Sequence, residues 1–214
     1  MKKRSLTTRN LLDKKPGKPV MLSDETLKAA IGENAELRGS WLIYGNEKNG
    51  KTWFSLILAR AIAAHHKVAY ISAEEGLEGS FLSAVRRAGI TASDRIQWHE
   101  YLTKDEIIET YRKPRTAEVI FIDNLTRYIG EIAPSDILTI QQRLPSKLIV
   151  YVAHEENKHP IPAAGIRALT FARVVFRIAG LRALITSRYE GGGGEMILDI
   201  EGSSLYWGEK IITN

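Results

Sequence analysis

Short apolar runs alternate with longer helical patterns along most of the chain, and this order predicts its architecture. Four runs are apolar enough for strands buried on both faces and a fifth is weaker; they cover residues 41–44, 68–72, 119–122, 148–153 and, more weakly, 96–99. Helical patterns lie around them, over residues 26–31, 52–64, 79–88, 104–111 and 135–143. Because strands that alternate with helices form βαβ units, we predict an α/β fold with a mostly parallel sheet and helices on both faces.

The boundaries of two helices and the end of the chain follow from local signals. Ser23-Asp24-Glu25 is typical of a helix start, and Ser135 is expected to cap the helix that follows it. After residue 173, short strands without a long helix between them are expected over residues 174–178, 182–188, 196–200 and 205–207. We interpret them as an antiparallel C-terminal extension of the sheet. Residues 190–195 include four consecutive glycines and are expected to form a hairpin tip.

One segment matches the phosphate-binding pattern GxxxxGK[ST]. It reads Gly45-Asn46-Glu47-Lys48-Asn49-Gly50-Lys51-Thr52 and stands between a predicted strand and a predicted helix. Its glycines permit backbone angles that turn N–H groups inward around phosphate oxygens, and the helix start adds its own free N–H groups. Lys51 would reach the β- and γ-phosphates and the Thr52 hydroxyl would bind Mg²⁺, while Lys48 is expected to be solvated. The alternative is a glycine turn without a ligand.

Three acidic residues and a histidine follow predicted strands, where the ligand sites of open α/β sheets collect. Asp123 ends one strand and has the form of a carboxylate that holds Mg²⁺ through water. Glu74 and Glu75 follow another strand; one of them could orient or deprotonate an attacking water, or both could be solvated loop carboxylates. His154 follows a third strand and could hydrogen-bond a γ-phosphate, or it could be structural.

Length and composition limit the class of protein. The chain has 214 residues and 44% hydrophobic content, which fits one substantial α/β domain. No stretch approaches the ~18 apolar residues of a membrane span, and the basic start is not followed by the apolar segment of a signal peptide. The absence of cysteine excludes disulfides and zinc ribbons and fits a cytoplasmic protein. We therefore expect a cytoplasmic protein that does not act on a membrane.

The net charge of +5 is unevenly distributed along the sequence. Residues 1–18 hold seven lysines and arginines and one aspartate, a balance of +6, so that subtraction leaves −1 for the rest of the chain. We therefore assign the basicity to an N-terminal arm, residues 1–22, ahead of one folded domain, residues 23–214. The arm could touch phosphate backbones or a neighbouring subunit, or it could be a solvated leader.

Four ordered segments carry a resemblance to a known superfamily. They are the phosphate loop of residues 45–52, Tyr70-Ile71-Ser72-Ala73-Glu74-Glu75-Gly76, Ile120-Phe121-Ile122-Asp123-Asn124-Leu125 and Val150-Tyr151-Val152-Ala153-His154. Their order resembles the RecA-like P-loop ATPases, specifically the hexameric replicative helicases of plasmids and phages (RepA type) and their DnaB-type relatives, over roughly residues 37–207. The resemblance implies ATP and Mg²⁺ as cofactors and assembly into a hexameric ring or a filament. In this family Glu74, directly after a small residue, corresponds to the catalytic glutamate.

The resemblance also implies roles for residues in the second half of the chain. The strand ending in His154 would lie between the strands of the phosphate loop and of Asp123, which puts His154 beside the γ-phosphate. The loop of residues 155–167 corresponds to a DNA-contacting loop; its contact candidates are Lys158 and Arg167. Arg188 corresponds to an arginine that reaches the γ-phosphate of the neighbouring subunit. Thr186 stands where the family has a lysine, which departs from the family pattern.

Three classes of function are compatible with these features. The first is a Mg-dependent ATPase that forms rings or filaments and works on single-stranded DNA. The second is an ATP-gated switch or assembly scaffold without helicase activity, which the missing lysine and the near-neutral domain favour. The third, a small-molecule kinase, usually needs an arginine-bearing helical lid late in the chain, where we predict strands.

Overall fold

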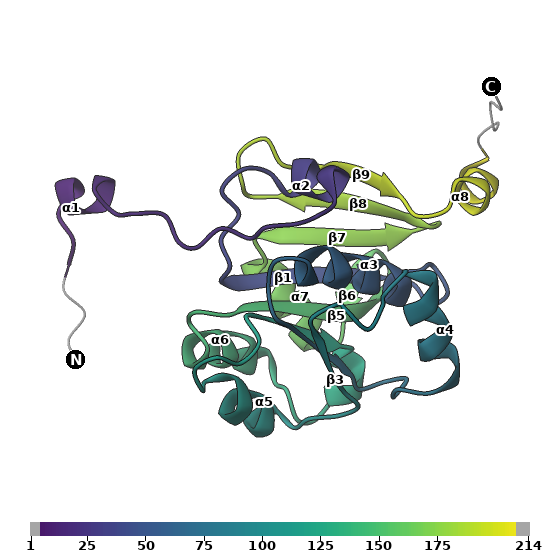
Figure 1. The fold of residues 1–214 in the computed structure, drawn as a ribbon, viewed down its shortest axis with the longest axis horizontal. Coiled ribbons are helices and arrows are strands. Elements are labelled where there is room, and N and C mark those ends of the chain that lie inside the picture. The colour runs from purple at the N-terminus through teal and green to yellow at the C-terminus, as the bar shows by residue number, and fades with distance from the viewer. Residues whose placement is uncertain (1–4, 209–214) are drawn as a thin grey trace.

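The computed structural model describes residues 5–208, and a single sheet runs through this part of the chain (Figure 1). The strand order is β3-β2-β4-β5-β1-β7-β8-β9, with β6 paired to β5 off that path. The strands are β1 (Gly39–Gly45), β2 (Val68–Ser72), β3 (Ile96–His99), β4 (Val119–Asp123), β5 (Leu148–Glu156), β6 (His159–Ile161), β7 (Val174–Ala179), β8 (Arg182–Ser187) and β9 (Gly194–Ile197). Pairing is parallel from β3 through to β7 and antiparallel from β7 to β9, as the sequence predicts.

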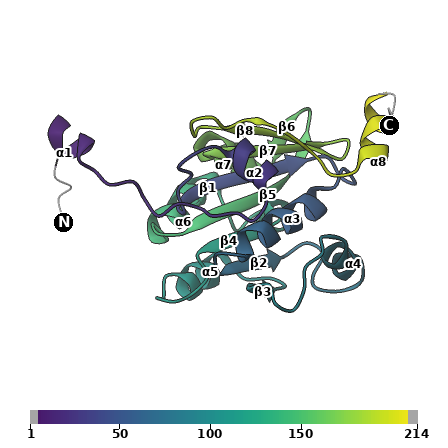
Figure 2. The ribbon, with the colours of Figure 1, turned by 45° about the horizontal axis from the view of Figure 1, so that its top comes forward.

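Helices cover both faces of the sheet (Figure 2). One face carries α2 (Glu25–Ile31), α3 (Lys51–Ala63) and α4 (Gly79–Arg87). The other carries α5 (Lys104–Tyr111), the 3-10 helix η1 (Leu125–Tyr128), α6 (Pro134–Arg143) and α7 (Ala163–Phe171). Two further helices, α1 (Thr8–Leu12) and α8 (Ile200–Trp207), lie near the two ends of the chain.

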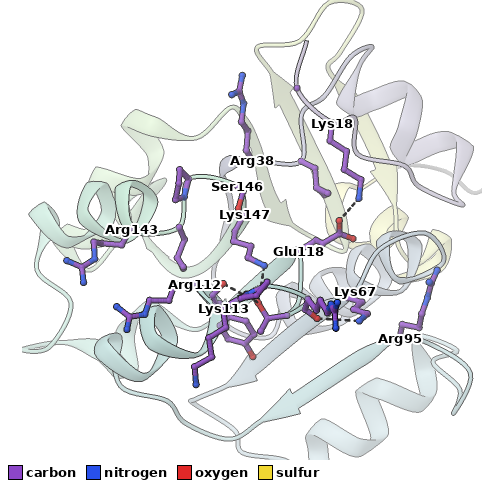
Figure 3. Close-up of a pocket in the computed structure, with 18 of the residues that line it drawn as sticks. Lys18, Arg38, Lys67, Arg95, Arg112, Lys113, Glu118, Arg143, Ser146 and Lys147 are labelled. Carbon is purple, nitrogen blue, oxygen red and sulfur yellow. Dashed lines mark hydrogen bonds and ion pairs between the residues drawn. The ribbon is translucent and has the colours of Figure 1, made fainter. Parts of the chain in front are cut away.

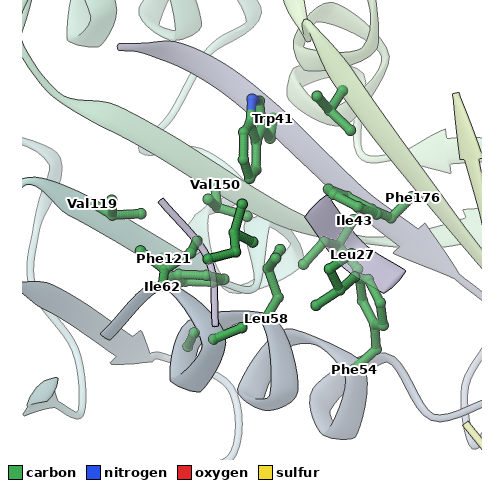
Figure 4. Close-up of a cluster of buried hydrophobic side chains, with 14 of the residues drawn as sticks. Leu27, Trp41, Ile43, Phe54, Leu58, Ile62, Val119, Phe121, Val150 and Phe176 are labelled. Carbon is green, nitrogen blue, oxygen red and sulfur yellow. The ribbon is translucent and has the colours of Figure 1, made fainter. Parts of the chain in front are cut away.

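The sheet divides the core into two layers because successive strand residues point to opposite faces. On β1, Trp41 and Ile43 join the cluster beneath α3, whereas Leu42 and Tyr44 join the cluster on the other side. Figure 4 shows side chains of α3 meeting those of the strands in the first cluster. This two-sided burial holds the central strands rigidly, so the loops at their carboxyl ends have fixed positions.

The order of the central strands agrees with the resemblance. β5 lies between β1 and β4, so His154 at the end of β5 is adjacent to the phosphate loop after β1 and to Asp123 at the end of β4. The predicted start of α2 is also confirmed, because the Asp24 carboxylate accepts the N–H of Leu27 at 2.9 Å.

Two predictions near helix starts are wrong. Residues 205–207 are part of α8 rather than a strand, because β9 ends at Ile197 and Asp199 then caps the helix, accepting the N–H of Gly202 at 2.8 Å. Ser135 does not cap α6. The cap position is Ala133, whose N–H donates to the carboxylate of Asp136 at 2.9 Å.

The predicted open loop over residues 155–167 is instead regular structure. β5 continues to Glu156 and turns back as β6, after which α7 begins at Ala163. The turn passes through Asn157 and Lys158, both with positive φ. A hairpin and a helix start therefore replace the loop.

The N-terminal arm has two parts. Helix α1 has no buried residue and lies apart from the sheet in both views (Figures 1 and 2). Pro19 by contrast forms an antiparallel bridge with Glu36, and Val20 and Leu22 are buried in the core. Lys2, Lys3 and Arg4 of the arm lie outside the described residues.

Within residues 5–208, no helix combines the length and the apolar character needed to cross a membrane.

Candidate nucleotide-binding site

The phosphate loop joins the end of β1 to the start of α3. Gly50 occupies the N-cap of α3 with φ of 92°, a left-handed conformation that favours glycine. Lys51 is the first residue of the helix and is only 8% exposed; its Nζ donates to the carbonyl of Asn46 at 2.9 Å. Burial lowers the pKa of Lys51, an effect opposed by the nearby carboxylates of Asp123 and Glu74. The loop thus closes on its own lysine, as the sequence pattern predicts for a phosphate cradle.

Asn49 fastens the loop to the neighbouring hairpin. Its Oδ1 accepts the N–H of Gly180 at 2.8 Å, and its Nδ2 donates to the carbonyl of Glu47 at 3.0 Å. Gly180 and Leu181 form the two-residue turn between β7 and β8, both with positive φ, as a type I′ hairpin requires. The Leu181 side chain lies against Gly50, so this turn forms one wall of the loop.

Asp123 is buried at the end of β4 and is held from β2. The Tyr70 hydroxyl donates to its Oδ2 at 2.5 Å and lies 2.6 Å from the hydroxyl of Ser55 on α3. Burial raises the pKa of Asp123 to about 7, an effect that the Tyr70 hydrogen bond opposes and the Glu74 charge reinforces. A carboxyl in this state gains strongly from a nearby cation.

Glu74 lies in a hydrogen-bonded cluster with two other side chains. His154 Nε2 is 2.9 Å from Glu74 Oε1 and 2.8 Å from Asn124 Nδ2, and Asn124 also donates to Glu74 Oε2. The His154 hydrogen bond lowers the pKa of Glu74, so the carboxylate is ionised at neutral pH. The cluster brings together Glu74 and His154, which the sequence assigns to the same site.

Glu75 points to a different partner. Its carboxylate accepts hydrogen bonds from Thr52 Oγ1 at 3.2 Å and from Ser80 Oγ at 3.0 Å. Thr52, Glu75 and Asp123 line one cleft and offer oxygen ligands, the kind that Mg²⁺ prefers. The donor set therefore fits Mg²⁺, with Thr52 and Asp123 as its expected ligands.

The cleft itself has a volume of about 500 Å³ and is lined by most of these groups. Its phosphate-loop side is formed by Lys51 and Thr52, and its far side by Glu74, Asp123 and His154. Phosphate-binding and water-activating groups therefore face a common space, which is the arrangement that in-line attack on a terminal phosphate requires.

Comparison with known proteins identifies the fold. No protein-family model matches the sequence, and a search of curated proteins finds no match. Among solved structures, the chain is similar to the ATPase domain of a helicase, with a TM-score of 0.57 and 13% identity over 82% of this chain and 88% of that one. It is also similar to the flagellar accessory protein FlaH from Methanocaldococcus jannaschii, with a TM-score of 0.55 and 16% identity over 82% and 89%. The chain has a RecA-like P-loop ATPase fold.

Within this RecA-like fold, Arg188 lies far from the phosphate loop of its own chain. It follows β8, which runs antiparallel to β7, and its N–H donates to the carbonyl of Arg173 just before β7 begins. Six strand residues at ~3.4 Å each separate it by roughly 20 Å from the Gly180 turn that contacts the loop. Its guanidinium donates to the carbonyl of Thr170 at 3.0 Å. Arg188 therefore does not reach the nucleotide site of its own RecA-like domain.

Lys158 and Arg167 lie on the hairpin and helix that follow β5. Lys158 is exposed in the β5–β6 turn, and Arg167 is exposed on α7, where its guanidinium lies 4.4 Å from the ring centroid of Phe171. Both follow the strand that ends near His154, but neither contacts the Glu74 cluster through a hydrogen bond within residues 5–208.

Several side chains of the RecA-like site were not predicted from the sequence. Asn124 and Tyr70 hold the two acidic residues, and Arg87 lines the cleft with its guanidinium 3.5 Å from the ring centroid of Trp53. Tyr70 occupies an inward position on a buried strand, where aromatic residues are common, so only its polar tip could have signalled a role.

Proposed function

We propose that this chain is a Mg-dependent ATPase that assembles into rings or filaments and couples ATP hydrolysis to binding of, or movement along, single-stranded nucleic acid. The proposal includes a cytoplasmic location. The observation that carries the ATPase assignment is the Glu74–His154–Asn124 cluster, which lies in the same cleft as the Lys51 amine and the Asp123 carboxylate.

In this proposal each residue has a distinct part in hydrolysis. The backbone N–H groups of the loop and Lys51 hold the phosphates, and Glu74 takes a proton from the attacking water as its oxygen bonds to the γ-phosphorus. The bond from the γ-phosphorus to the β-phosphate oxygen breaks in the same displacement. Mg²⁺, when bound to Thr52 and Asp123, would neutralise negative charge on the phosphates. His154 holds Glu74 and could pass the state of the γ-phosphate to the hairpin that follows β5.

Assembly follows from the position of Arg188. Because it lies at the opposite end of the sheet from its own phosphate loop, a role in catalysis requires a second subunit. Lys158 and Arg167 are the candidate nucleic-acid contacts, since the strand that carries them begins beside His154. Nucleotide-dependent movement of that hairpin would grip or release the strand.

A second candidate function is an ATP-gated switch or scaffold without helicase activity. Thr186 in place of the family's lysine favours it, and the similar FlaH structure is that of an accessory protein. A small-molecule kinase is less well supported. The argument from terminal strands fails because α8 is a helix, but α8 (Ile200–Trp207) contains neither arginine nor lysine and therefore cannot serve as an arginine-bearing lid.

The deciding experiment is the steady-state ATPase rate as a function of protein concentration, with and without single-stranded DNA. The Lys51→Ala variant supplies the background rate. A rate per subunit that rises with protein concentration and again with DNA supports the motor. A rate equal to that of Lys51→Ala in every condition refutes the ATPase and leaves the scaffold.

A further inference from the structure

A second, larger cleft lies at the edge of the sheet opposite the phosphate loop. It has a volume of about 950 Å³ and is lined by the segments that lead into the central strands. Lys67 directly precedes β2, Arg95 precedes β3, Glu118 precedes β4 and Lys147 precedes β5. The phosphate loop follows the carboxyl end of β1, so the two clefts are separated by the length of the strands.

This second cleft is strongly basic. Nine lysine and arginine side chains and one carboxylate, Glu118, line it, which gives a formal charge of +8. The assignment of all basicity to the N-terminal arm is therefore wrong. Residues 19–214 sum to −1 only because this concentrated positive charge is offset by acidic residues elsewhere. Figure 3 shows Lys147 and Glu118 in the middle of the cleft with the arginines arranged around them.

Few of these cations are neutralised by the protein itself. Glu118 pairs with Lys18 and with His66, and Lys147 is 9% exposed, with its amine donating to the carbonyl of Ala117 at 2.6 Å. Four exposed cations at the rim have no carboxylate within ion-pairing distance among residues 5–208. They are Arg112, Lys113, Arg115 and Arg143.

Helix dipoles account for only part of this charge. Arg112 follows the last residue of α5 and Arg143 ends α6, where a cation is favourable by about 0.3–1 kcal/mol. Lys113 and Arg115 lie beyond the helix end and add like charges at close range, which costs free energy in the isolated protein. An ordinary solvated surface intersperses charges of both signs. The concentration of one sign indicates a polyanionic ligand.

The shape and chemistry of the cleft narrow the class of polyanion. The cations extend from β5 across β4 and β2 to β3, roughly 14 Å at the usual strand spacing, which is longer than a single phosphate group. Five of the nine are arginines, whose guanidinium groups match phosphate oxygens in pairs. None of the exposed large hydrophobic residues of the described chain lines the cleft, so it lacks the apolar contacts that insert into a lipid surface.

The arm strengthens this assignment. Gly17 and Lys18 line the cleft, and the preceding arm residues include Lys14 and Lys15, so the basic surface continues into the arm. We propose that this cleft binds the phosphodiester backbone of nucleic acid without sequence preference. The inference goes beyond the proposed function, because it concerns a surface remote from the ATP site and requires no hydrolysis.

The test uses the full chain without nucleotide and follows the anisotropy of labelled dT30 and U30 oligonucleotides over a range of salt concentrations. The cleft variant is Arg112→Glu/Arg143→Glu. The matched control is Lys28→Glu/Arg86→Glu, which changes the formal charge equally at exposed positions outside the cleft. We expect the cleft variant to bind both oligonucleotides at least about tenfold more weakly and the control to stay within about twofold. The slope of log affinity against log salt should fall by about 1.4, the value for two lost phosphate contacts on a single strand.

Further outcomes separate the alternatives. Equal weakening in the cleft variant and the control would mean that only overall charge matters and would overturn the proposal. Unchanged oligonucleotide binding with loss of binding to phosphatidylserine vesicles would overturn it in favour of a lipid ligand. Lys51→Ala should bind the oligonucleotides like the wild type, and basal ATPase activity should survive in the cleft variant. If no ATPase activity exists but cleft-dependent binding persists, the proposed function fails and this inference stands.

Discussion

The Tyr70 hydroxyl donates to the Asp123 carboxylate at 2.5 Å, from one buried strand of the sheet to the next. The Ser55 hydroxyl on α3 lies 2.6 Å from the same Tyr70 oxygen. The residue expected to hold Mg²⁺ is therefore fixed by a chain of hydroxyl groups that begins one helical turn after the phosphate loop. Movement of α3 relative to the sheet would change the environment of Asp123.

We expect Tyr70→Phe to impair the Mg²⁺-dependent step more than nucleotide binding. The substitution removes the donor that orients Asp123, and loss of such a supporting contact typically costs 10–100-fold in metal affinity or activity. The measurement is ATPase rate as a function of Mg²⁺ concentration. Tyr151→Phe is the control, because its hydroxyl is also buried in the sheet but has no hydrogen-bond partner among residues 5–208. Equal effects of the two substitutions would contradict a specific role for Tyr70.

Glu74 and Glu75 can be distinguished by their amides. We expect Glu74→Gln to lower kcat by about 10²–10⁴, because an amide cannot accept the proton of the attacking water. Nucleotide affinity should change little. Glu75→Gln should lower activity less and mainly at low Mg²⁺, since Glu75 contacts the Thr52 hydroxyl. If Glu75→Gln had the larger effect on kcat, the assignment of the two carboxylates would have to be exchanged.

A shared active site predicts a specific result for Arg188. Arg188→Ala should reduce ATPase activity by at least about 10²-fold while nucleotide affinity stays near that of the wild type. Mixing it with Lys51→Ala should restore activity, to about a quarter of the wild-type rate for random assembly, because intact loops would then meet intact arginines. Absence of restoration, or a large loss of nucleotide affinity in the monomer, would mean that Arg188 acts within its own subunit or in folding.

The parts of the fold that periodicity determines were predictable from the sequence. Each central strand is a continuous apolar run because it is buried on both faces, and such runs are distinct from their surroundings. The phosphate loop was predictable for a different reason, since its glycines and lysine have fixed spacing. The side chains at the strand ends, Glu74, Asp123 and His154, followed from topology once the strands were ordered.

Other features depend on contacts between distant segments and were not predictable. Residues 205–207 are as apolar as a strand, but the capping of α8 by Asp199 decides for a helix. The basic cleft was missed because its cations come from segments far apart in the sequence, such as Lys67 and Arg143, and net charge averages over them. The role of Tyr70 was missed because its position identified it as core.

The last prediction concerns the attachment of the arm. Glu36 binds the guanidinium of Arg38 through contacts of 2.7 and 3.0 Å, pairs with Arg173, and accepts the N–H of Gly17 at 2.9 Å. The Arg38 hydrogen bond is the main cause that lowers the pKa of Glu36 to about 2. Because the pKa is lower in the folded protein, the stabilisation is complete above the unfolded-state pKa near 4.5 and is lost as the pH falls through about 2. We expect Glu36→Gln to reduce the free energy of unfolding by about 1–2 kcal/mol at pH 7, allowing for partial solvent screening.

Urea unfolding at several pH values between 7 and 3 tests this prediction. The difference between wild type and Glu36→Gln should begin to shrink below pH ~4.5 and reach about half its neutral value near pH 3. Glu25→Gln is the control, since its carboxylate is 81% exposed and pairs only with Lys28 in the described chain; it should change stability by less than about 0.5 kcal/mol. A Glu36→Gln effect that is the same at pH 7 and pH 3 would show that the side chain stabilises the arm by packing rather than by its charge.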